Sequence, residues 1–347
     1  MKTVLWAPGT NHSLAPLTHF GPKILVPILN RPMLEYYVGQ LQNWPAAQSP
    51  IILTTNPKII THHINTAENR FLVQKISYQA NSSEWIRLGQ LLPFLQESLL
   101  FIDARIFAMF NWKSLYDQHK KSGALLSVIY VPFNAIKGND ALDLDSLKRL
   151  KALYKIRESH LNKNVNLLTP CYFFEPRIKS LIPSDPFLRI RDFISYLTKK
   201  GVHINAIKAR GIFEPMRTLR YYVQLNFDLL KHATVGLQIS GSEIQEGIFV
   251  GRRCKIKVNI NENFVRPVLI GNRVKIARDV TIRGPAVIGH KVKIDKGATI
   301  DRSIVLHHTY VGKMVEVNNA VVAGNWYASV RNLYPARIEE NFILHTY

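Results

Sequence analysis

The sequence predicts an α/β fold in two parts, a mostly parallel sheet with helices on both faces followed by a coil of short parallel strands. Short apolar runs alternate with helical patterns over the first two thirds of the chain, which is typical of a parallel sheet. From residue 244 on, aliphatic residues return at every sixth position. The chain has 347 residues, enough for two domains. We place these domains at 1–235 and 240–325, with a tail at 326–347.

The elements of the first part follow from apolar runs and from signals at their ends. The expected strands lie at 4–7, 50–55, 73–78, 99–102 and 124–131. The expected helices lie at 57–65, 88–97 and 112–121. Gly123 closes the last of these helices, because glycine is common just past a helix end. In such sheets, ligands bind beyond the carboxyl ends of the strands.

The stretch 145–163 is rich in basic residues and predicts a basic helix. Its cations are Lys148, Arg149, Lys151, Lys155 and Arg157. A run of charge most often forms a solvated face, and a binding role is the alternative.

The second part shows an aliphatic repeat of six residues. Its unbroken members are Ile270, Ile276, Ile282, Ile288, Ile294 and Ile300, with earlier members Ile244, Val250 and Ile256 and later members Val305, Val311 and Val317. Six residues form one face of a triangular coil, so eighteen make one turn of a parallel β-helix.

Composition limits the classes of function. No apolar run reaches the roughly 20 residues of a membrane span, so we expect no integral membrane protein. Cys171 and Cys254 are too few and too distant to form a disulfide framework, which favours a reducing, cytoplasmic location. The net charge of +21 indicates a polyanionic partner, or else a proteome that is basic throughout.

The first strand leads into a segment with an unusually specific pattern. Its matching residues are Ala7, Gly9, Leu14, Pro16, Leu17, Thr18, Pro22, Lys23, Pro27, Asn30, Pro32, Met33 and Leu34. This segment resembles the N-terminal signature of the sugar-1-phosphate nucleotidyltransferases, also called NDP-sugar pyrophosphorylases. The resemblance implies a Rossmann-like nucleotidyltransferase domain followed by a left-handed parallel β-helix of hexapeptide repeats.

The resemblance also implies roles for individual residues. Ala7, Gly9 and Lys23 match the nucleotide-binding positions, and Lys23 would be catalytic in an active member. Asp103 ends a buried strand and would hold Mg²⁺ in an active member, because carboxylates suit Mg²⁺ beside phosphates. We expect no other cofactor.

Several residues of the family's chemistry are replaced. Pro8 and Asn11 stand for loop glycines, and Ser13 stands for the phosphate-binding Arg. A later segment, 211–230, also resembles a segment of this family, and Thr218, Tyr222 and Asn226 fix the register of the match. In that register Pro215 stands for the second metal-binding Asp, and we expect the Glu214 side chain on the opposite face of its strand. The bulky run 84–86 replaces a nucleotide loop, and the sugar-phosphate motif is missing.

Three hypotheses of function follow. The first is a catalytically degenerate member that acts as a binding, regulatory or assembly subunit, as in subunits of the eukaryotic translation-initiation guanine-nucleotide exchange factor. The second is an active sugar-1-phosphate nucleotidyltransferase with a divergent site, in which Arg31, Lys23 and Lys208 supply charge. The third is a polyanion-binding protein. We also expect a homo-oligomer or hetero-complex built through the β-helix, since repeat coils leave edges to cover.

The basic charge gathers on the predicted coil. Residues eighteen apart stack at strand spacing, which places Arg273 under Lys291 and Lys275 under Lys293. If 262–267 adds two residues at a corner, Arg253 and Lys255 extend both columns by one coil. Stacked like charges destabilise a sheet, so an acidic protein, nucleic acid or anionic surface is the expected partner. A solvated face is the alternative.

Overall fold

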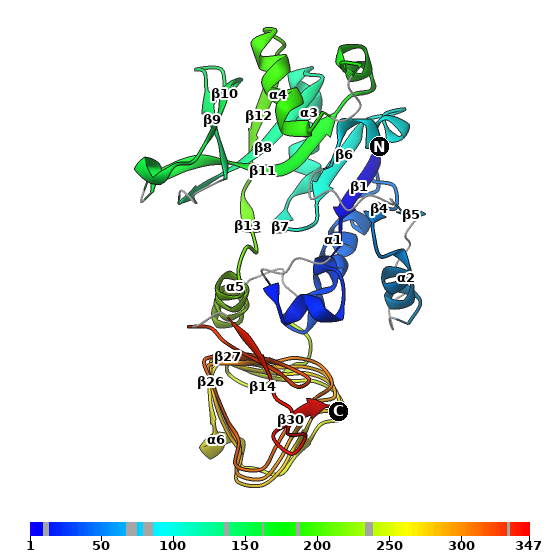
Figure 1. Cartoon of the computed structure of the whole chain (residues 1–347). Coiled ribbons are helices and arrows are strands. Elements are labelled where there is room, and N and C mark those ends of the chain that lie inside the picture. Colours follow the sequence, from blue (N-terminus) through cyan, green and yellow to red (C-terminus); the bar gives the residue numbers. More distant parts are fainter. Residues whose placement is uncertain are drawn as a thin grey trace. The chain divides into compact units, whose positions relative to one another are not determined.

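The computed structural model describes residues 1–9, 14–66, 75–78, 86–134, 139–161, 163–184, 188–232, 239–331 and 334–347 (Figure 1). The chain divides into two compact units, each made of two separate stretches. The first unit comprises Met1–Gly9 and Leu34–Phe213, and the second comprises Thr10–Met33 and Glu214–Tyr347. Most of the N-terminal signature therefore lies in the same unit as the repeats.

The first unit contains the predicted sheet. Within the described residues the sheet has nine strands, in the order β10-β9-β11-β6-β1-β4-β5, with β8 beside β11 and β12 beside β8. The strands are β1 (Lys2–Ala7), β4 (Ile51–Thr54), β5 (Lys75–Tyr78), β6 (Leu99–Asp103), β8 (Leu126–Asn134), β9 (Asp140–Leu144), β10 (Leu150–Lys155), β11 (Asn164–Phe174) and β12 (Ile204–Lys208). The half β6-β1-β4-β5 is parallel, as predicted, whereas β11 runs antiparallel to β6 and β8.

The helices of the first unit mostly follow their sequence signals. They are α1 (Met33–Gln42), α2 (Pro57–Thr66), α3 (Trp112–Ser122) and α4 (Ile190–Lys199). In α3, the side chain of Asn111 accepts a hydrogen bond from the backbone of Ser114 at 3.0 Å, and Gly123 ends the helix with φ +64°. The helices predicted at 57–65 and 112–121 are confirmed.

Two predicted helices are wrong. The stretch 88–97 forms only the short 3-10 turns η4 (Leu88–Gln90) and η5 (Leu92–Phe94), because Pro93 lacks the N–H that a continuing helix needs. The basic stretch 145–163 begins as the turn of a β9–β10 hairpin. There the Asp145 carboxylate accepts hydrogen bonds from the backbones of Leu147 and Arg149, so turn chemistry overrides the helical composition.

Shorter elements complete the first unit and lead into the second. Strand β7 (Phe107–Phe110) pairs with β13 (Gly211–Glu214), and 3-10 turns form η6 (Glu158–His160) and η7 (Pro176–Leu181). In the second unit, η2 (Leu17–Phe20), η3 (Lys23–Leu25) and the small hairpin of β2 (Pro27–Ile28) and β3 (Arg31–Pro32) precede the long helix α5 (Leu219–His232).

The predicted β-helix makes up most of the second unit. One face holds β15 (Ile248–Val250), β18 (Val268–Ile270), β21 (Ala286–Ile288), β24 (Ile304–Val305) and β27 (Ala320–Ala323). The second holds β16 (Lys255–Ile256), β19 (Lys275–Ile276), β22 (Lys293–Ile294) and β25 (Thr309–Val311), and the third holds β17 (Phe264–Val265), β20 (Thr281–Arg283), β23 (Thr299–Asp301) and β26 (Glu316–Asn318). These neighbours run parallel, and the triangular coil is plain in Figure 1. Ile270 pairs with Ile288 and Ile276 with Ile294, which confirms the eighteen-residue turn.

The repeat is less regular at its N-terminal end than predicted. Ile256 pairs with Ile276, twenty residues on, whereas Phe264 pairs with Ile282, eighteen residues on. The two extra residues thus lie between Ile256 and Phe264, at the helical turn α6 (Ile260–Asn263), which overlaps only the first two residues of the predicted stretch 262–267. Ile244 is not a core member, because it lies on the antiparallel strand β14 (Ser242–Gln245) and is 51% exposed.

The predicted tail adds strands to the last coil. Strand β28 (Trp326–Ser329) runs antiparallel to β27 and pairs with β29 (Pro335–Arg337), while β30 (Leu344–Thr346) runs antiparallel to β25. Leu344 is buried against the core of the coil. In the described part of the chain, no helix combines the length and the hydrophobicity that crossing a membrane requires.

Candidate functional site

Part of the predicted site lies at the carboxyl edge of the parallel strands of the first unit. Trp6 pairs with Asp103, so Ala7 and Asp103 end their strands at the same edge of the sheet. Gly9 follows β1, and a side chain there would collide with Thr55, since a Cβ atom would lie 2.8 Å from the Thr55 hydroxyl oxygen. The structure therefore brings Ala7, Gly9 and Asp103 together, as the sequence predicted.

The Asp103 carboxylate is occupied by a neighbouring cation. Arg105 donates from Nε to Oδ1 at 2.9 Å and from Nη2 to Oδ2 at 2.6 Å. The Arg105 backbone N–H adds a third bond to Oδ1 at 3.1 Å. The carboxylate is almost buried, and such a two-point charge-assisted pair is among the stronger polar contacts in proteins. Sequence reasoning missed Arg105, although a cation two residues beyond a strand-end Asp is a visible signal.

Lys23 belongs to the second unit and has a structural partner there. Its side chain is buried, and Nζ donates to the backbone oxygen of Met216 at 2.5 Å. Met216 adopts a left-handed backbone conformation, with φ +53°. The ammonium group thus ties the turn before α5 to η3.

Glu214 lies close to the same turn. Its Oε1 accepts a hydrogen bond from the Met216 backbone at 3.2 Å. Burial raises the pKa of the Glu214 carboxyl to about 7, and the Met216 N–H and the positive charge of Lys23 only partly offset that effect. Pro215, at the position of the second metal-binding Asp, is buried and offers no oxygen from its side chain.

The matched frame residues hold the N-terminal segment against α5 and the β-helix. The Tyr222 hydroxyl donates to the backbone oxygen of Pro27 at 2.9 Å, and Asn226 accepts from the backbone of Leu29 at 2.8 Å. The Asn30 side chain donates to the backbone oxygen of Ile288 at 2.7 Å. Tyr222, Asn226 and Asn30 therefore have structural roles within the second unit.

The residues present do not form the Mg²⁺ site that the resemblance implies. Both oxygens of Asp103 accept from Arg105, and Pro215 cannot supply a second carboxylate. In the described stretches, no group of three or more His, Cys, Asp or Glu residues is arranged to hold a metal ion. The loop at 10–13 and the first two residues of the bulky run 84–86, where further departures were predicted, lie outside the described residues, whereas Ile86 is described and buried.

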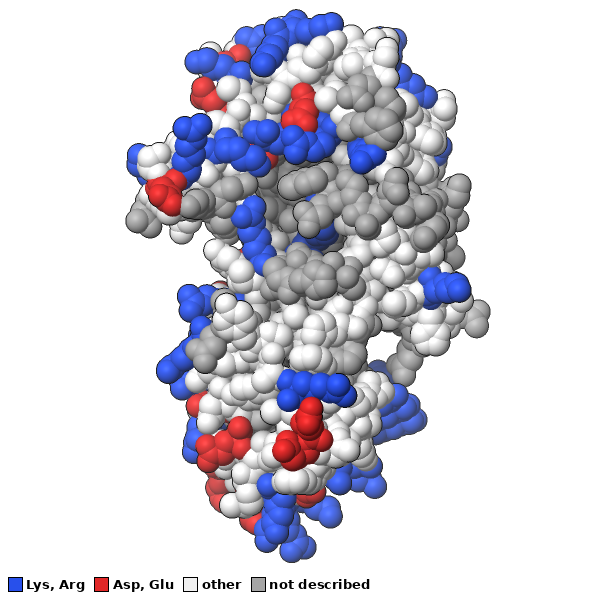
Figure 2. Space-filling model, viewed as in Figure 1, with Lys and Arg blue, Asp and Glu red and all other residues white. Residues whose placement is uncertain are grey.

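A second candidate site is the pair of cationic columns on the β-helix. The first column consists of Arg253, Arg273 and Lys291, and the second of Lys255, Lys275 and Lys293. Lys255 pairs with Lys275 and Lys275 with Lys293, which is the predicted register. Lysines and arginines outnumber acidic residues on the face in Figure 2, in line with the net charge of +21.

The two columns differ in what surrounds them. In the second column, Lys275 donates to the Tyr347 hydroxyl at 2.6 Å, and Nζ of Lys293 lies 4.9 Å from the Tyr310 ring centroid. The first column occupies three corners with φ between +55° and +59°, a conformation that favours Asn or Gly over Lys and Arg. Its three side chains are exposed, and none has an acidic partner within 4.0 Å among the described residues.

A mixed α/β sheet with a parallel half, followed by a parallel β-helix, is the architecture that the resemblance to the nucleotidyltransferases implies. Comparison with known proteins finds similarity to sugar-1-phosphate nucleotidyltransferases, the family that the N-terminal signature resembles. The chain is 23% identical over 348 residues to the UTP–glucose-1-phosphate uridylyltransferase of Synechocystis sp., covering 94% of this chain and 88% of the relative.

Two further relatives match shorter stretches. The low-salt glycan biosynthesis nucleotidyltransferase Agl11 of Haloferax volcanii is 47% identical over 53 residues, or 15% of each chain. The bifunctional sugar-1-phosphate nucleotidylyltransferase/acetyltransferase of Sulfurisphaera tokodaii is 34% identical over 58 residues, or 17% of this chain and 14% of the relative. No family model matches the chain.

Proposed function

We propose that this chain is a catalytically degenerate homologue of the sugar-1-phosphate nucleotidyltransferases that acts as a binding, regulatory or assembly subunit. The observation that carries the proposal is the two-point pair between Arg105 and Asp103. Nucleotidyl transfer depends on positioning and on charge at the phosphates, which Mg²⁺ and cationic side chains supply. A carboxylate already neutralised by Arg105 is a poor ligand for a cation.

The position of Lys23 supports the same proposal. Its ammonium group is buried and bonded to the Met216 backbone, so its charge serves the fold of the second unit. Loss of one strong electrostatic contact to a transition state costs about 3–4 kcal/mol, and several such contacts are altered here. We therefore expect turnover to be lost while the fold and its binding surfaces remain.

The test is pyrophosphate-dependent cleavage of UDP-glucose and other sugar nucleotides in the presence of Mg²⁺. We expect no turnover. A rate on the order of 1 per second or more that Asp103→Ala abolishes would overturn the proposal. Thermal unfolding with nucleoside triphosphates and sugar nucleotides separates binding without turnover from no binding, because a ligand of the native state raises the melting temperature.

An active transferase with a divergent site is the second candidate. The similarity to a uridylyltransferase along 94% of the chain favours it. In that case Arg31 and Lys208 supply charge in place of the altered residues, and Asp103→Ala abolishes a measurable rate. Single substitutions of Arg31 and Lys208 by Gln then lower that rate, whereas they change nothing in a degenerate protein.

The first cationic column favours a polyanion-binding role beside either candidate. The three stacked cations at left-handed corners repel one another, and a bound anion would offset this repulsion. Binding to heparin, nucleic acid or anionic vesicles should weaken steeply with salt as counterions are released. Arg273→Glu/Lys291→Glu should abolish most of this retention.

The matched control is Lys58→Glu/Lys121→Glu, which makes the same change of charge at exposed lysines of the first unit. Equal retention of both double variants would show that total charge, and not the column, binds the polyanion.

A further inference from the structure

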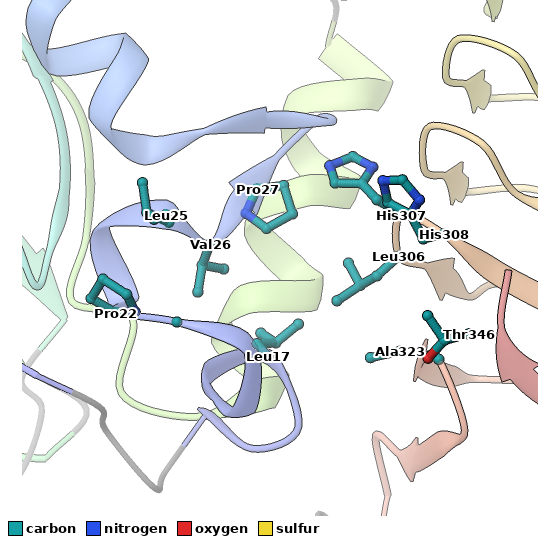
Figure 3. Close-up of a pocket in the computed structure, with 12 residues that line it drawn as sticks. Leu17, Pro22, Leu25, Val26, Pro27, Leu306, His307, His308, Ala323 and Thr346 are labelled. Carbon is teal, nitrogen blue, oxygen red and sulfur yellow. The ribbon is translucent and has the colours of Figure 1, made fainter. Parts of the chain in front are cut away.

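A cavity of about 340 Å³ lies inside the second unit, between the N-terminal segment and the last coils of the β-helix. Figure 3 shows Leu25, Val26 and Pro27 on one side and Leu306 opposite them. Among the described residues that line it, none is Lys, Arg, Asp or Glu. The volume is at the lower end of ordinary ligand pockets, which run from about 300 to 1,000 Å³. Its lining favours a small, apolar and uncharged occupant.

A ladder of side chains along one corner of the β-helix leads to this cavity. Each member accepts a hydrogen bond from the backbone of the coil below it. The Asn272 Oδ1 accepts from Arg252 at 2.8 Å, and the His290 Nδ1 accepts from Asn272 at 2.8 Å. The His307 Nδ1 accepts from His290 at 2.7 Å, and the two imidazole rings are stacked with centroids 4.6 Å apart.

The ladder fixes the protonation of His307. A ring nitrogen that accepts a backbone N–H carries no proton, so in the neutral ring the proton is on Nε2. Burial lowers the pKa of His307 to about 3, and the neighbouring His290 and His308 act in the same direction. His307 therefore presents a neutral N–H donor at ordinary pH.

The Nε2 atoms of His290 and His307, on neighbouring coils, have different surroundings. On His290, Nε2 lies 3.1 Å from the backbone oxygen of Asn30, which anchors the N-terminal segment. One coil further on, His307 lines the cavity, and within the described residues its Nε2 has no hydrogen-bond acceptor. His307 is only half-buried and Nε2 is not a fully buried atom, so this donor is open to the cavity, where a ligand oxygen can take the place of solvent as its acceptor.

We propose that this cavity binds a small, neutral, mainly apolar molecule whose carbonyl-type oxygen accepts a hydrogen bond from Nε2 of His307. Apolar contact with Leu25, Val26 and Leu306 supplies most of the affinity, and the hydrogen bond selects an oxygen-bearing ligand over its hydrocarbon analogue. An anionic ligand is disfavoured, since no cationic side chain among the described residues lines the cavity.

The ligand would also act on the N-terminal segment. Pro22 and Leu25 line the cavity on either side of the buried Lys23, which belongs to the same short turn η3. Occupation of the cavity therefore stabilises the turn that holds Lys23 against Met216. This inference does not depend on whether the chain catalyses nucleotidyl transfer, because it concerns binding alone.

The test uses two pairs of probes that differ only in the acceptor oxygen. Acetophenone is compared with ethylbenzene, and 1-indanone with indane. Their size suits the site, since an apolar cavity of roughly 150 Å³ already holds benzene. Affinities are measured by saturation-transfer NMR and by the shift of the melting temperature of the full chain. The ketones should bind more tightly than the hydrocarbons by roughly 2- to 10-fold, as expected for one neutral hydrogen bond.

Two variants locate the binding. His307→Asn keeps an oxygen to accept from His290, because Asn272 already caps its neighbour in this way, while its amide N–H₂ takes the place of the ring Cδ2 and is set back from the position of Nε2. It should abolish the preference for ketones while the hydrocarbons bind as before. Ala323→Leu fills the cavity and should weaken all four probes, whereas the same change at Ala277, outside the cavity, should not.

Each of three results would overturn the proposal. One is failure of all four probes to bind the folded wild type at millimolar concentration. Another is an equal affinity for ketone and hydrocarbon in the wild type. The last is a ketone preference that survives His307→Asn. Sugar-nucleotide turnover has no bearing on these outcomes, so failure here is distinct from failure of the proposed function.

Discussion

At the scale of single residues, the side chain of Arg105 occupies the Asp103 carboxylate at the end of β6. The resemblance implies a metal ligand at Asp103, yet both oxygens of its carboxylate accept hydrogen bonds from one guanidinium group. The pair is only slightly exposed on the aspartate side, so water replaces the lost bonds poorly if the arginine is removed.

We predict that Arg105→Gln lowers the free energy of unfolding by about 1–3 kcal/mol, because it leaves a nearly buried carboxylate without its charged donor. Urea denaturation of both proteins measures the difference. The control is Arg278→Gln at an exposed corner, which should change stability by less than about 0.5 kcal/mol. Equal effects of the two substitutions would mean that the Asp103 pair adds nothing to stability.

Glu214 should make stability depend on pH. Its folded pKa of about 7 is above the ordinary value of 4.5, so the folded state keeps the proton that the unfolded state has released. The unfolded state binds fewer protons between these two values, and the free energy of unfolding therefore falls as the pH rises from about 4.5 to about 7. Below that window both states are protonated, and above it the loss is constant.

Glu214→Gln removes this titration. The variant should gain stability relative to wild type across the same window, with the gain levelling off above it. Chemical denaturation at pH 4.5, 6 and 7.5 measures the gain. Glu339→Gln, a change at an exposed glutamate, is the control. A stability difference that stays flat from pH 4.5 to 7.5 would rule out the raised pKa.

At the scale of elements, α5 is the support of the N-terminal segment. Asn226 is fully buried and bonds both ways, accepting from the Leu29 backbone and donating to the Tyr222 backbone within its own helix. Leu29 and Asn30 both adopt left-handed conformations, which this contact helps to hold.

We predict that Asn226→Ala costs about 1–3 kcal/mol of unfolding free energy, because the Leu29 N–H is left buried without an acceptor. It should also increase hydrogen exchange at residues 26–30. Gln224→Ala changes an exposed residue of the same helix and should do neither. If hydrogen exchange at residues 26–30 is unchanged in Asn226→Ala, the contact with α5 does not stabilise this segment.

The elements differ in how far their sequence predicts them. The β-helix could be predicted because inward Ile residues of one coil pair with Ile or Val of the next coil, so the packing of the core produces a regular aliphatic period in the sequence. The hairpin at 140–155 could not, since its turn depends on Asp145 bonding two particular backbone groups while its composition resembles a helix.

For the candidate site, the positions that follow strands could be predicted from the sequence, whereas the long-range contacts could not. Asp103 and Gly9 follow from their positions after strands, because strand order places those ends at one edge. The hydrogen bond between Lys23 and the Met216 backbone joins residues 193 apart, and no local sequence pattern predicts such a contact. The cavity beside His307 likewise depends on how distant segments pack, which periodicity does not report.

At the scale of the whole molecule, we expect assembly at the open end of the β-helix. Strand β14 has all four residues exposed and forms the edge of its sheet, and Ile244 and Val265 are both more than half exposed. Exposed apolar strand edges tend to pair with another chain.

We predict that the chain purifies as a homo-oligomer or with a partner, and that Ile244→Glu shifts it toward a monomer of 39.7 kDa. Light scattering at micromolar concentration measures the mass. Ile59→Glu, at an exposed isoleucine of the first unit, is the control. A wild-type mass of one chain with no co-purifying protein would contradict the prediction.

The division of the chain between its two units has a consequence for its synthesis. The segment 14–33 leaves the ribosome well before the groups that bond it, since Asn30 and Ile288 are 258 residues apart in the chain. At about 5–20 residues per second, the segment waits on the order of tens of seconds for those partners. Its apolar side chains stay available to chaperones and to other nascent chains during that interval. A chain truncated after the last strand of the sheet would lack the β-helix residues that bond the segment 14–33.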